Sequence, residues 1–479
     1  MKLKDIVEKI ECKTVGKVNG EITHLSHLAQ ECHEKSIYFC LNSDQSQAAR
    51  WVDIAVQNGC KVIVCENTVI SNKKIVQIVV KDARKAMSQI ASLFYGEPAK
   101  KLQIIGVTGT NGKTTTTTMI AHLLKCKYSV GLVGTNGVSY ADKKIDTGFT
   151  TPDPIAMHKI FADMVNCGVT HVVMEYSAHA IYLQKLWGIT SHIVAFTNLS
   201  QDHLDFFENM QNYYKAKEKL FTEGLYNTAI VCTDDEYGKK LSSVAINCLT
   251  CSSNNSNADI FIANKEHTTI SQNFEVLSQN GSAKIKLKLL GAFNLQNAVV
   301  AISVCLKCGL SFAEISEALE SFNGVDGRFE CYNNGQNTVI IDYAHTPDGL
   351  ANVLKTAKEI AKKNKLISVF GCGGNRDAAK RPLMGAISQR YADFTIVTTD
   401  NPRFEDNYQI AQEIIKGFSN NKYKVVLDRG QALREALDMC RPGDIIMLAG
   451  KGAEPYIDIM GTKVEWSEKK LVENVLNIK

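Results

Sequence analysis

The chain lacks the long apolar segments that mark membrane and secreted proteins. No apolar run reaches the ~18 residues that a membrane-spanning helix needs. The first residues, Met1–Lys9, alternate charged and apolar side chains without an unbroken apolar stretch, so we expect no signal peptide. We therefore expect a soluble protein of the cytoplasm with no insertion into a membrane.

The chain also lacks an excess of one charge and any paired spacing of cysteines. Its 54 basic and 50 acidic residues give a formal net charge of +4, which offers no reason to expect nucleic acid as a partner. The 15 cysteines are scattered, and Cys305 and Cys308, the nearest thing to a metal or redox pair, fall within an apolar helical stretch. We interpret the cysteines as free thiols of a reducing cytosol.

A glycine-rich stretch, Gly106–Thr115, follows the apolar strand candidate Leu102–Ile105 and precedes a helical stretch. This order is typical of a loop whose backbone N–H groups bind phosphate. The strict motif fails because Val107 takes the place of its first glycine, and Thr-Gly-Thr-Asn-Gly-Lys-Thr stands as a narrower variant. We expect Lys113 to contact the outer phosphates of a nucleotide and the Thr114 hydroxyl to contact magnesium.

The length and composition predict a protein of several α/β domains. At 479 residues the chain is too long for one core, and 45% hydrophobic with 22% charged residues is ordinary for a globular protein. Short apolar strand candidates alternate with helical stretches, which favours mostly parallel sheets. We predict a small N-terminal α/β domain over residues 1–99, a central P-loop ATPase-like parallel-sheet domain over 100–327, and a Rossmann-like doubly wound domain over 328–479.

Polar clusters follow the strand candidates of both larger domains, where ligands of α/β sheets gather. In the central domain, Glu175 follows one strand candidate and Thr197–His203 follows the next. A carboxylate and an imidazole there can complete the ligand shell of magnesium beside a transferred phosphoryl group. In the C-terminal domain the clusters are Asp342–His345, Gly371–Asp377, Asp400–Arg403 and Gly450–Glu454.

Together these motifs resemble those of the Mur ligases, in family order from about residue 100 to the end of the chain. The motifs are Gly109–Thr115, Thr150–Asp153, Met174–Ala180, Thr197–Asp205, Gly291–Asn297, Asp326–Glu330, Asp342–Asp348 and Asp400–Arg403. The resemblance implies an ATP-dependent amide ligase of peptidoglycan precursor synthesis. Its substrates would be ATP, UDP-N-acetylmuramoyl-L-alanyl-D-glutamate and meso-diaminopimelate, with Mg²⁺ as cofactor and an acyl phosphate as intermediate. We expect a monomer.

The resemblance also assigns roles to individual residues. It implies catalytic roles for Lys113, Glu175, His203 and Lys217, and metal binding by Thr114, Glu175, His203 and Lys217, of which Lys217 aligns with a lysine that is carbamylated. It implies ATP contacts from Gly109, Thr110, Asn111, Gly112, Lys113, Thr114, Thr115, Asn294, Asn297, Arg328, Asp342 and His345. It implies UDP-sugar contacts from Ser26, Thr150, Thr151, Ser177 and Lys185, and diaminopimelate contacts from Arg376, Asp400, Asn401, Pro402, Arg403, Gly450 and Glu454.

The chemistry of Arg403 suits a substrate with a second carboxylate. Diaminopimelate differs from lysine by a second carboxylate, and a planar guanidinium binds a carboxylate through two parallel hydrogen bonds. Lysine would leave this arginine unpaired in a closed site, at a cost of about 1 to 3 kcal/mol.

The sequence departs from the family pattern at several positions and leaves other functions open. Ala178 replaces a usual serine, Lys185 a usual arginine, Ala453 the histidine of Gly-Lys-Gly-His-Glu, and Leu25–His27 follows Asp-Ser-Arg loosely. One alternative is a ligase of the same fold that adds lysine or a dipeptide, or that glutamylates folate. Another is a nucleotide-binding homologue that has lost turnover.

Overall fold

The computed structural model describes residues 1–41, 44–69, 74–267 and 271–478. The chain forms two compact units. The first comprises Met1–Gly106, Tyr128–Val194 and Lys219–Asn227, and the second comprises Val107–Lys127, Ala195–Glu218 and Thr228–Lys479. Within the part of the chain that the structure describes, every helix falls short of the length and apolar character that a membrane span requires.

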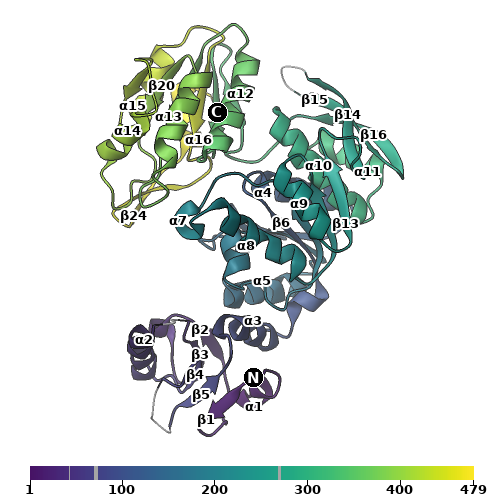
Figure 1. The fold of residues 1–479 in the computed structure, drawn as a ribbon, viewed down its shortest axis with the longest axis vertical. Helices are drawn as coiled ribbons and strands as arrows, with labels where there is room; N and C mark the ends of the chain where they lie inside the picture. Colours follow the sequence, from purple (N-terminus) through teal and green to yellow (C-terminus); the bar gives the residue numbers. More distant parts are fainter. Residues whose placement is uncertain (42–43, 70–73, 268–270, 479) are drawn as a thin grey trace. The chain divides into compact units, whose positions relative to one another are not determined.

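The N-terminal part is a five-stranded sheet with helices on both faces (Figure 1). Its strands follow the order β1-β5-β4-β3-β2, and only β1 runs antiparallel to its neighbour. Ile37 and Phe39 pack with α1 and α3, while Tyr38 packs with α2 on the other face, as the alternation of side chains in a strand requires. The elements are α1 (Leu3–Val7), β1 (Lys13–Val15), β2 (His24–Ser26), β3 (Ser36–Phe39), α2 (Gln45–Gln57), β4 (Val62–Cys65), β5 (Val76–Val79) and α3 (Ala83–Phe94).

The central part is built on an eleven-stranded sheet in the order β16-β15-β14-β13-β12-β11-β6-β10-β7-β8-β9. The pairs β7 with β10 and β12 with β13 with β14 are parallel, whereas β8 and β9 at one edge and β15 and β16 at the other are antiparallel. The strands are β6 (Gln103–Thr108), β7 (Val130–Gly134), β8 (Gly137–Tyr140), β9 (Lys143–Ile145), β10 (His171–Glu175), β11 (Ser191–Phe196), β12 (Tyr226–Cys232), β13 (Cys248–Ser252), β14 (Ile260–His267), β15 (Gln272–Ser278) and β16 (Gly281–Leu287).

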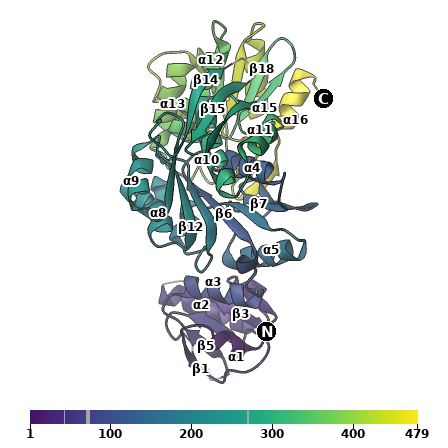
Figure 2. The same ribbon diagram turned by 90° about the vertical axis from the view of Figure 1, so that its right-hand side faces the viewer.

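Helix α4 shows how packing overrides local preference in this part. It carries a run of threonines, which are poor helix formers because they branch at Cβ. Thr114–Thr117 are nevertheless buried, and α4 packs beside α10 (Figure 2). The helices of the central part are α4 (Lys113–Leu124), α5 (Pro154–Asn166), α6 (Ala178–Tyr182), α7 (Leu204–Phe207), α8 (Met210–Thr222), α9 (Glu236–Val244), α10 (Ala292–Lys307) and α11 (Phe312–Glu320).

The C-terminal part is a doubly wound sheet in the order β17-β18-β22-β19-β20-β21 with an antiparallel edge strand, β17. Helices α12, α13 and α14 cover one face, and α15 and α16 cover the other (Figure 1). The strands are β17 (Glu330–Asn333), β18 (Thr338–Asp342), β19 (Leu366–Phe370), β20 (Phe394–Val397), β21 (Tyr423–Val425) and β22 (Ile445–Ala449). The helices are α12 (Pro347–Ala361), α13 (Lys380–Tyr391), α14 (Asn407–Ile415), α15 (Arg429–Asp438) and α16 (Glu468–Leu476).

A two-stranded hairpin, β23 (Tyr456–Ile459) and β24 (Thr462–Glu465), follows β22. Its two turn residues, Met460 and Gly461, both have positive φ, 53° and 80°, as a tight hairpin turn requires. A bridge joins Ile459 of this hairpin to Arg403 in the loop after β20.

The predicted α/β fold class is confirmed, including the parallel core of the C-terminal sheet. The antiparallel edges of the central sheet were not predicted from the sequence. The predicted domain boundaries, 1–99, 100–327 and 328–479, stay a prediction.

Candidate functional site

The loop between β6 and α4 is shaped by two glycines with positive φ. Gly109 has φ 152° and Gly112, which immediately precedes α4, has φ 83°. A Cβ at Gly109 would lie 1.9 Å from the Thr197 hydroxyl, and one at Gly112 would lie 2.1 Å from Oδ1 of Asn297. Both the backbone conformation and the packing therefore require glycine.

The segment after β11 braces this loop. Thr197 Oγ1 donates to the Asn111 carbonyl over 2.7 Å, and the Asn111 N–H donates to Asn198 Oδ1 over 2.9 Å. The Thr110 N–H donates to the Asn198 carbonyl over 2.8 Å, and the Ser200 N–H donates to Thr110 Oγ1 over 3.1 Å. These contacts fix the loop before any ligand arrives, which lowers the cost of ordering it on binding.

Two lysines converge on the same loop. The Lys113 ammonium donates to the carbonyls of Gly109 and Thr110, over 2.9 and 2.8 Å, and the Lys217 ammonium donates to the Gly109 carbonyl over 2.9 Å. Lys217 is 1% exposed and lies 4.8 Å from the centre of the Tyr213 ring. Burial, together with repulsion from Lys113, holds the pKa of Lys217 well below its ordinary value, although Asp202 opposes the shift.

Two histidines lie beside the Asp202 carboxylate. Its Oδ2 lies 3.3 Å from Nε2 of His203 and 3.9 Å from Nε2 of His345. Burial alone would raise the pKa of Asp202, but attraction to the histidines and to Lys380 outweighs it and lowers the pKa to about 2. His203 itself has a left-handed backbone, with φ 55°, directly before α7.

Four further residues predicted to contact ATP also lie in the second unit. Asn297 Nδ2 donates to Asn294 Oδ1 over 3.0 Å at the start of α10, and both side chains are buried. Arg328 donates to the Thr114 hydroxyl over 3.1 Å, and its guanidinium stacks on Tyr343. Asp342 accepts the N–H groups of Phe329 and Ala344, each over 2.7 Å, which fixes the chain between the central and C-terminal sheets.

Four of the five residues predicted for the sugar-peptide substrate gather around Glu175 in the first unit. The Thr151 hydroxyl donates to the Glu175 carbonyl over 2.8 Å and lies 3.3 Å from the Ser177 hydroxyl, and Lys185 donates to the Thr151 carbonyl over 3.2 Å. Thr150 joins this cluster through the hydroxyl of Thr135. Burial lowers the pKa of Lys185.

The Glu175 carboxylate and the fifth predicted residue, Ser26, both have local partners. Glu175, 1% exposed, accepts the N–H and the hydroxyl of Thr135 over 2.8 and 3.1 Å. Ser26 is buried in the N-terminal sheet, where its hydroxyl contacts Leu28 and Glu31.

The donor set suits magnesium only together with oxygen ligands from a substrate. Across the described ranges of the chain, no three His, Cys, Asp or Glu side chains lie close enough to hold a metal ion. Magnesium in phosphoryl-transfer sites is usually bound by one or two side chains plus substrate phosphates and water. The residues present fit that mode, with the buried carboxylate of Glu175 as the strongest candidate ligand.

The residues predicted for the amino acid lie in the loops after β19, β20 and β22. Arg403 donates from Nη1 to the Gly374 carbonyl over 2.7 Å and has a left-handed backbone, with φ 53°. Asn401 Nδ2 donates to Oε2 of Glu454 over 2.8 Å. Arg376 is exposed on the loop after β19. The remaining predicted residues in these loops, all buried, are Asp400, Pro402 and Gly450.

The structure adds charged residues that were not predicted for the site. Lys451 is 0% exposed and contacts both Asn401 and Glu454. Arg381, 1% exposed, pairs with Glu405 and Glu413 and donates to the Gly373 carbonyl. Lys451 stands inside a predicted motif, so a lysine between two glycines at a strand end was an available signal. The sequence contains no such signal for Arg381, because its partners Glu405 and Glu413 are distant in the sequence.

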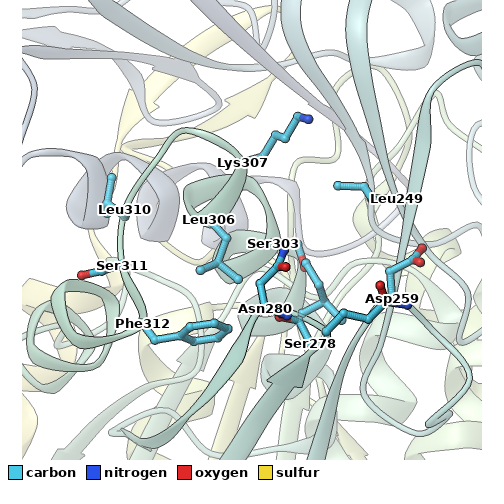
Figure 3. Close-up of a pocket in the computed structure, with 12 residues that line it drawn as sticks. Leu249, Asp259, Ser278, Asn280, Ser303, Leu306, Lys307, Leu310, Ser311 and Phe312 are labelled. Atoms are coloured by element: carbon cyan, nitrogen blue, oxygen red, sulfur yellow. The ribbon is translucent and has the colours of Figure 1, made fainter.

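A cavity of about 610 Å³ lies away from the residues described so far (Figure 3). It is lined by Leu306 and Lys307 at the end of α10, Phe312 of α11, Ser278 at the end of β15, and Asn280 in the turn that follows. Asn294 lies at the opposite end of α10 from Leu306, roughly 20 Å away at the rise of an α-helix. The cavity is therefore separate from the glycine-rich loop between β6 and α4, which we call the phosphate loop. None of the predicted site residues lines it.

The loop and the two sheets define the class as a P-loop α/β protein, and comparisons with known proteins define the family. The Mur ligase middle domain matches residues 107–305, and the Mur ligase glutamate ligase domain matches residues 327–452. The chain therefore belongs to the Mur ligase family, and it is an enzyme of the ligase class.

Two relatives and one solved structure match along their whole length. The UDP-N-acetylmuramoyl-L-alanyl-D-glutamate–2,6-diaminopimelate ligase 1 of Clostridium acetobutylicum is 38% identical, over 99% of each chain. The ligase of the same name from Clostridium tetani is 37% identical, also over 99% of each chain. A solved structure of such a ligase is 28% identical, with a TM-score of 0.71 over 100% of this chain and 99% of that one.

Gly112 combines a positive φ with a close approach to the Asn297 side chain. Gly112→Ala should weaken ADP binding by about tenfold or more, because alanine is strained at positive φ and its Cβ would displace Asn297 from the loop. Titration calorimetry with ADP measures the effect. Gly96→Ala is the matched control, because Gly96 has a similar φ of 78° and a Cβ there meets nothing within 4 Å. Equal ADP affinity in both variants would contradict the prediction.

Proposed function

We propose that the chain is the ATP-dependent ligase that adds meso-diaminopimelate to UDP-N-acetylmuramoyl-L-alanyl-D-glutamate. The observation that carries this proposal is the full-length match to relatives that bear this activity in their names, at 37 and 38% identity. The arginine in the loop after β20 supports the choice of amino acid. We further propose that the enzyme acts as a monomer in the cytoplasm.

The reaction requires activation of a carboxylate. A glutamate carboxylate oxygen of the sugar-peptide attacks the γ-phosphorus of ATP, the bond to the bridging oxygen breaks, and ADP leaves. The amine of the second substrate then attacks the acyl phosphate carbon, loses a proton and expels inorganic phosphate. Each step brings anions together, so the protein must supply positive charge and hydrogen-bond donors where negative charge gathers.

The phosphate loop supplies those groups in this proposal. Its N–H groups and the start of α4 hold the phosphates, and Lys113 moves from its loop carbonyls to the outer phosphates. Arg328 and His345 contact the nucleotide from the chain between the sheets and from the C-terminal sheet, and Asn294 and Asn297 contact its adenine side. The remaining residues proposed for ATP are Gly109, Thr110, Asn111, Gly112, Thr114, Thr115 and Asp342.

Magnesium, when bound, neutralises charge on the phosphates and polarises the transferred phosphoryl group. We propose Thr114, Glu175, His203 and a carbamylated Lys217 as its protein-side ligands. The low pKa of Lys217 supports carbamylation, because only a neutral amine adds carbon dioxide. The product is an anion, which would be attracted to Lys113 where the lysine ammonium is repelled by it.

The two other substrates would bind at two further groups of residues, one around Glu175 and one in the loops after β19, β20 and β22. Thr150, Thr151, Ser177 and Lys185 would hold the sugar-peptide around Glu175, with Ser26 toward the uracil. Arg376 and Arg403 would bind the distal carboxylate of diaminopimelate, and Asn401 and Glu454 would bind its amine. Asp400, Pro402 and Gly450 would shape the same pocket.

A product assay by mass tests the proposal. The purified enzyme receives ATP, magnesium and the UDP-dipeptide, with diaminopimelate, lysine or D-alanyl-D-alanine offered in turn. Diaminopimelate should give the largest amount of product and should stimulate phosphate release. Stimulation by lysine alone would assign a different amino acid. Binding of ATP and UDP-dipeptide without any product would favour a homologue that has lost turnover, consistent with Ala178 and Ala453.

Arg403→Ala should raise the KM for diaminopimelate about 10- to 100-fold, because it removes a charge-assisted hydrogen-bond pair worth about 1.5 to 3 kcal/mol. ADP affinity should stay unchanged. Steady-state kinetics measure the KM for diaminopimelate, and a titration measures the affinity for ADP. Arg390→Ala, at an exposed arginine of α13, is the control for loss of one guanidinium. Equal losses in amino-acid use and ADP affinity would mean that Arg403 is structural.

Lys217→Ala should lower kcat on the order of 100-fold, because it removes a proposed ligand of the metal. Acetate or formate should restore part of the activity by supplying a carboxylate in place of the carbamate. Lys215→Ala on the same helix, at an exposed position, is the matched control. Unaltered turnover in Lys217→Ala would refute the assigned role.

A further inference from the structure

The loop after β22 contains a fully buried lysine whose partners lie in three separate segments. Lys451 is 0% exposed. Its ammonium donates to Oδ1 of Asn401 over 2.9 Å, to Oε2 of Glu454, and to the Tyr456 carbonyl over 2.5 Å. The lysine thus joins the loop after β20, its own loop and the first residue of the hairpin strand β23.

These three partners saturate the lysine. An ammonium group has three N–H donors, and Lys451 has three acceptors. Burying a charge is costly unless it is paired and hydrogen-bonded, and Glu454 supplies the opposite charge. With every donor engaged inside the protein, Lys451 has none left for a substrate.

The partners of Lys451 are also bonded to one another. Asn401 Nδ2 donates to the same Glu454 oxygen over 2.8 Å, and Oδ1 of Asn401 accepts the Asp458 N–H over 2.8 Å. The Arg403 N–H in turn donates to the Asp458 carbonyl over 3.0 Å, and the Asp458 carboxylate lies 3.9 Å from Nε of Arg403. One hydrogen-bonded network therefore connects Lys451 with Asn401, Glu454 and Arg403.

We infer that Lys451 is a positioning residue for the amino-acid substrate. It orients the Asn401 amide and the Glu454 carboxylate, and it holds the hairpin against which Arg403 is set. The inference rests on the proposed function, since it takes these three residues as the amino-acid pocket. Loss of the ammonium removes one hydrogen bond from the Asn401 amide and leaves Glu454 without its counter-charge.

A neighbouring ion pair provides the comparison for a purely structural role. Arg429 pairs with Glu468, and both are at most 2% exposed. Arg429 donates to the carbonyls of Thr399 and Ala449, over 3.2 and 2.8 Å, so it ties the backbones at the ends of β20 and β22 together. Apart from the Glu468 carboxylate, Arg429 donates to backbone oxygens, whereas Lys451 contacts the side chains of Asn401 and Glu454.

The test compares Lys451→Met, which keeps the length of the side chain and removes its charge, with Glu468→Gln and with Lys470→Met at an exposed position. For each protein we measure the KM and kcat for diaminopimelate and lysine, ADP affinity, and the melting temperature. Lys451→Met should raise the KM for diaminopimelate about tenfold or more and reduce the preference for it over lysine, with ADP affinity unchanged. Glu468→Gln should lower the melting temperature without moving either KM, and Lys470→Met should change neither.

An unchanged KM in folded Lys451→Met, or a parallel loss of ADP affinity, would overturn the inference. If Lys451→Met does not fold, Lys451→Gln, which retains one donor group, takes its place in the same assay. Failure of the proposed function is seen separately in the unmodified enzyme. If the unmodified enzyme uses lysine in place of diaminopimelate, the proposed function fails, and the KM of Lys451→Met for lysine still tests the positioning role.

Discussion

The Gly109 carbonyl oxygen accepts hydrogen bonds from two lysine ammonium groups, and the central site depends on this convergence. Burial and repulsion from Lys113 both lower the pKa of Lys217, which is 1% exposed, because each disfavours a second positive charge at this carbonyl. Such an arrangement is costly unless negative charge is brought to it. Negative charge near the start of α4 would reduce this cost. A polyphosphate, a carboxylate or a carbamate could supply that charge.

The remaining architecture serves to keep that loop rigid and accessible. Glycines at positive φ allow the backbone to pass close to Thr197 and Asn297, and the segment after β11 holds the loop through Asn111 and Asn198. Because this bracing comes from backbone groups and short amides, the site does not depend on long, flexible side chains for its shape. Preorganised donors of this kind stabilise developing charge without reorganisation.

Sequence patterns predicted the strands well where both faces are buried. The predicted strand Leu102–Ile105 overlaps β6, which is buried from Ile104 to Thr108, since a continuous apolar run has few alternatives in an α/β fold. The antiparallel edges at β8, β9, β15 and β16 were not foreseen, because half-exposed strands carry mixed side chains with a weaker signal. The motif residues at strand ends were found for a physical reason, because parallel strands bring their carboxyl ends to one edge.

Contacts between distant segments could not be read from the sequence. The pairing of Arg429 with Glu468 spans 39 positions, and the contact of Lys451 with Asn401 spans 50. Nothing in the local pattern of either residue indicates its partner. Such buried charges contribute no periodicity, so only the folded chain reveals whether they face solvent, each other or a ligand.

The hairpin of β23 and β24 has a consequence for how this enzyme could be altered. It is a short appendage that follows the last strand of the sheet, and its tight turn at Met460 and Gly461 is formed by its own backbone. Its link to the amino-acid loops runs through Arg403, Asp458 and Lys451, while the phosphate loop lies in a different sheet. Under the proposed function, a change in the length or sequence of this hairpin would alter the loops proposed for the amino acid and leave the loop between β6 and α4 unchanged.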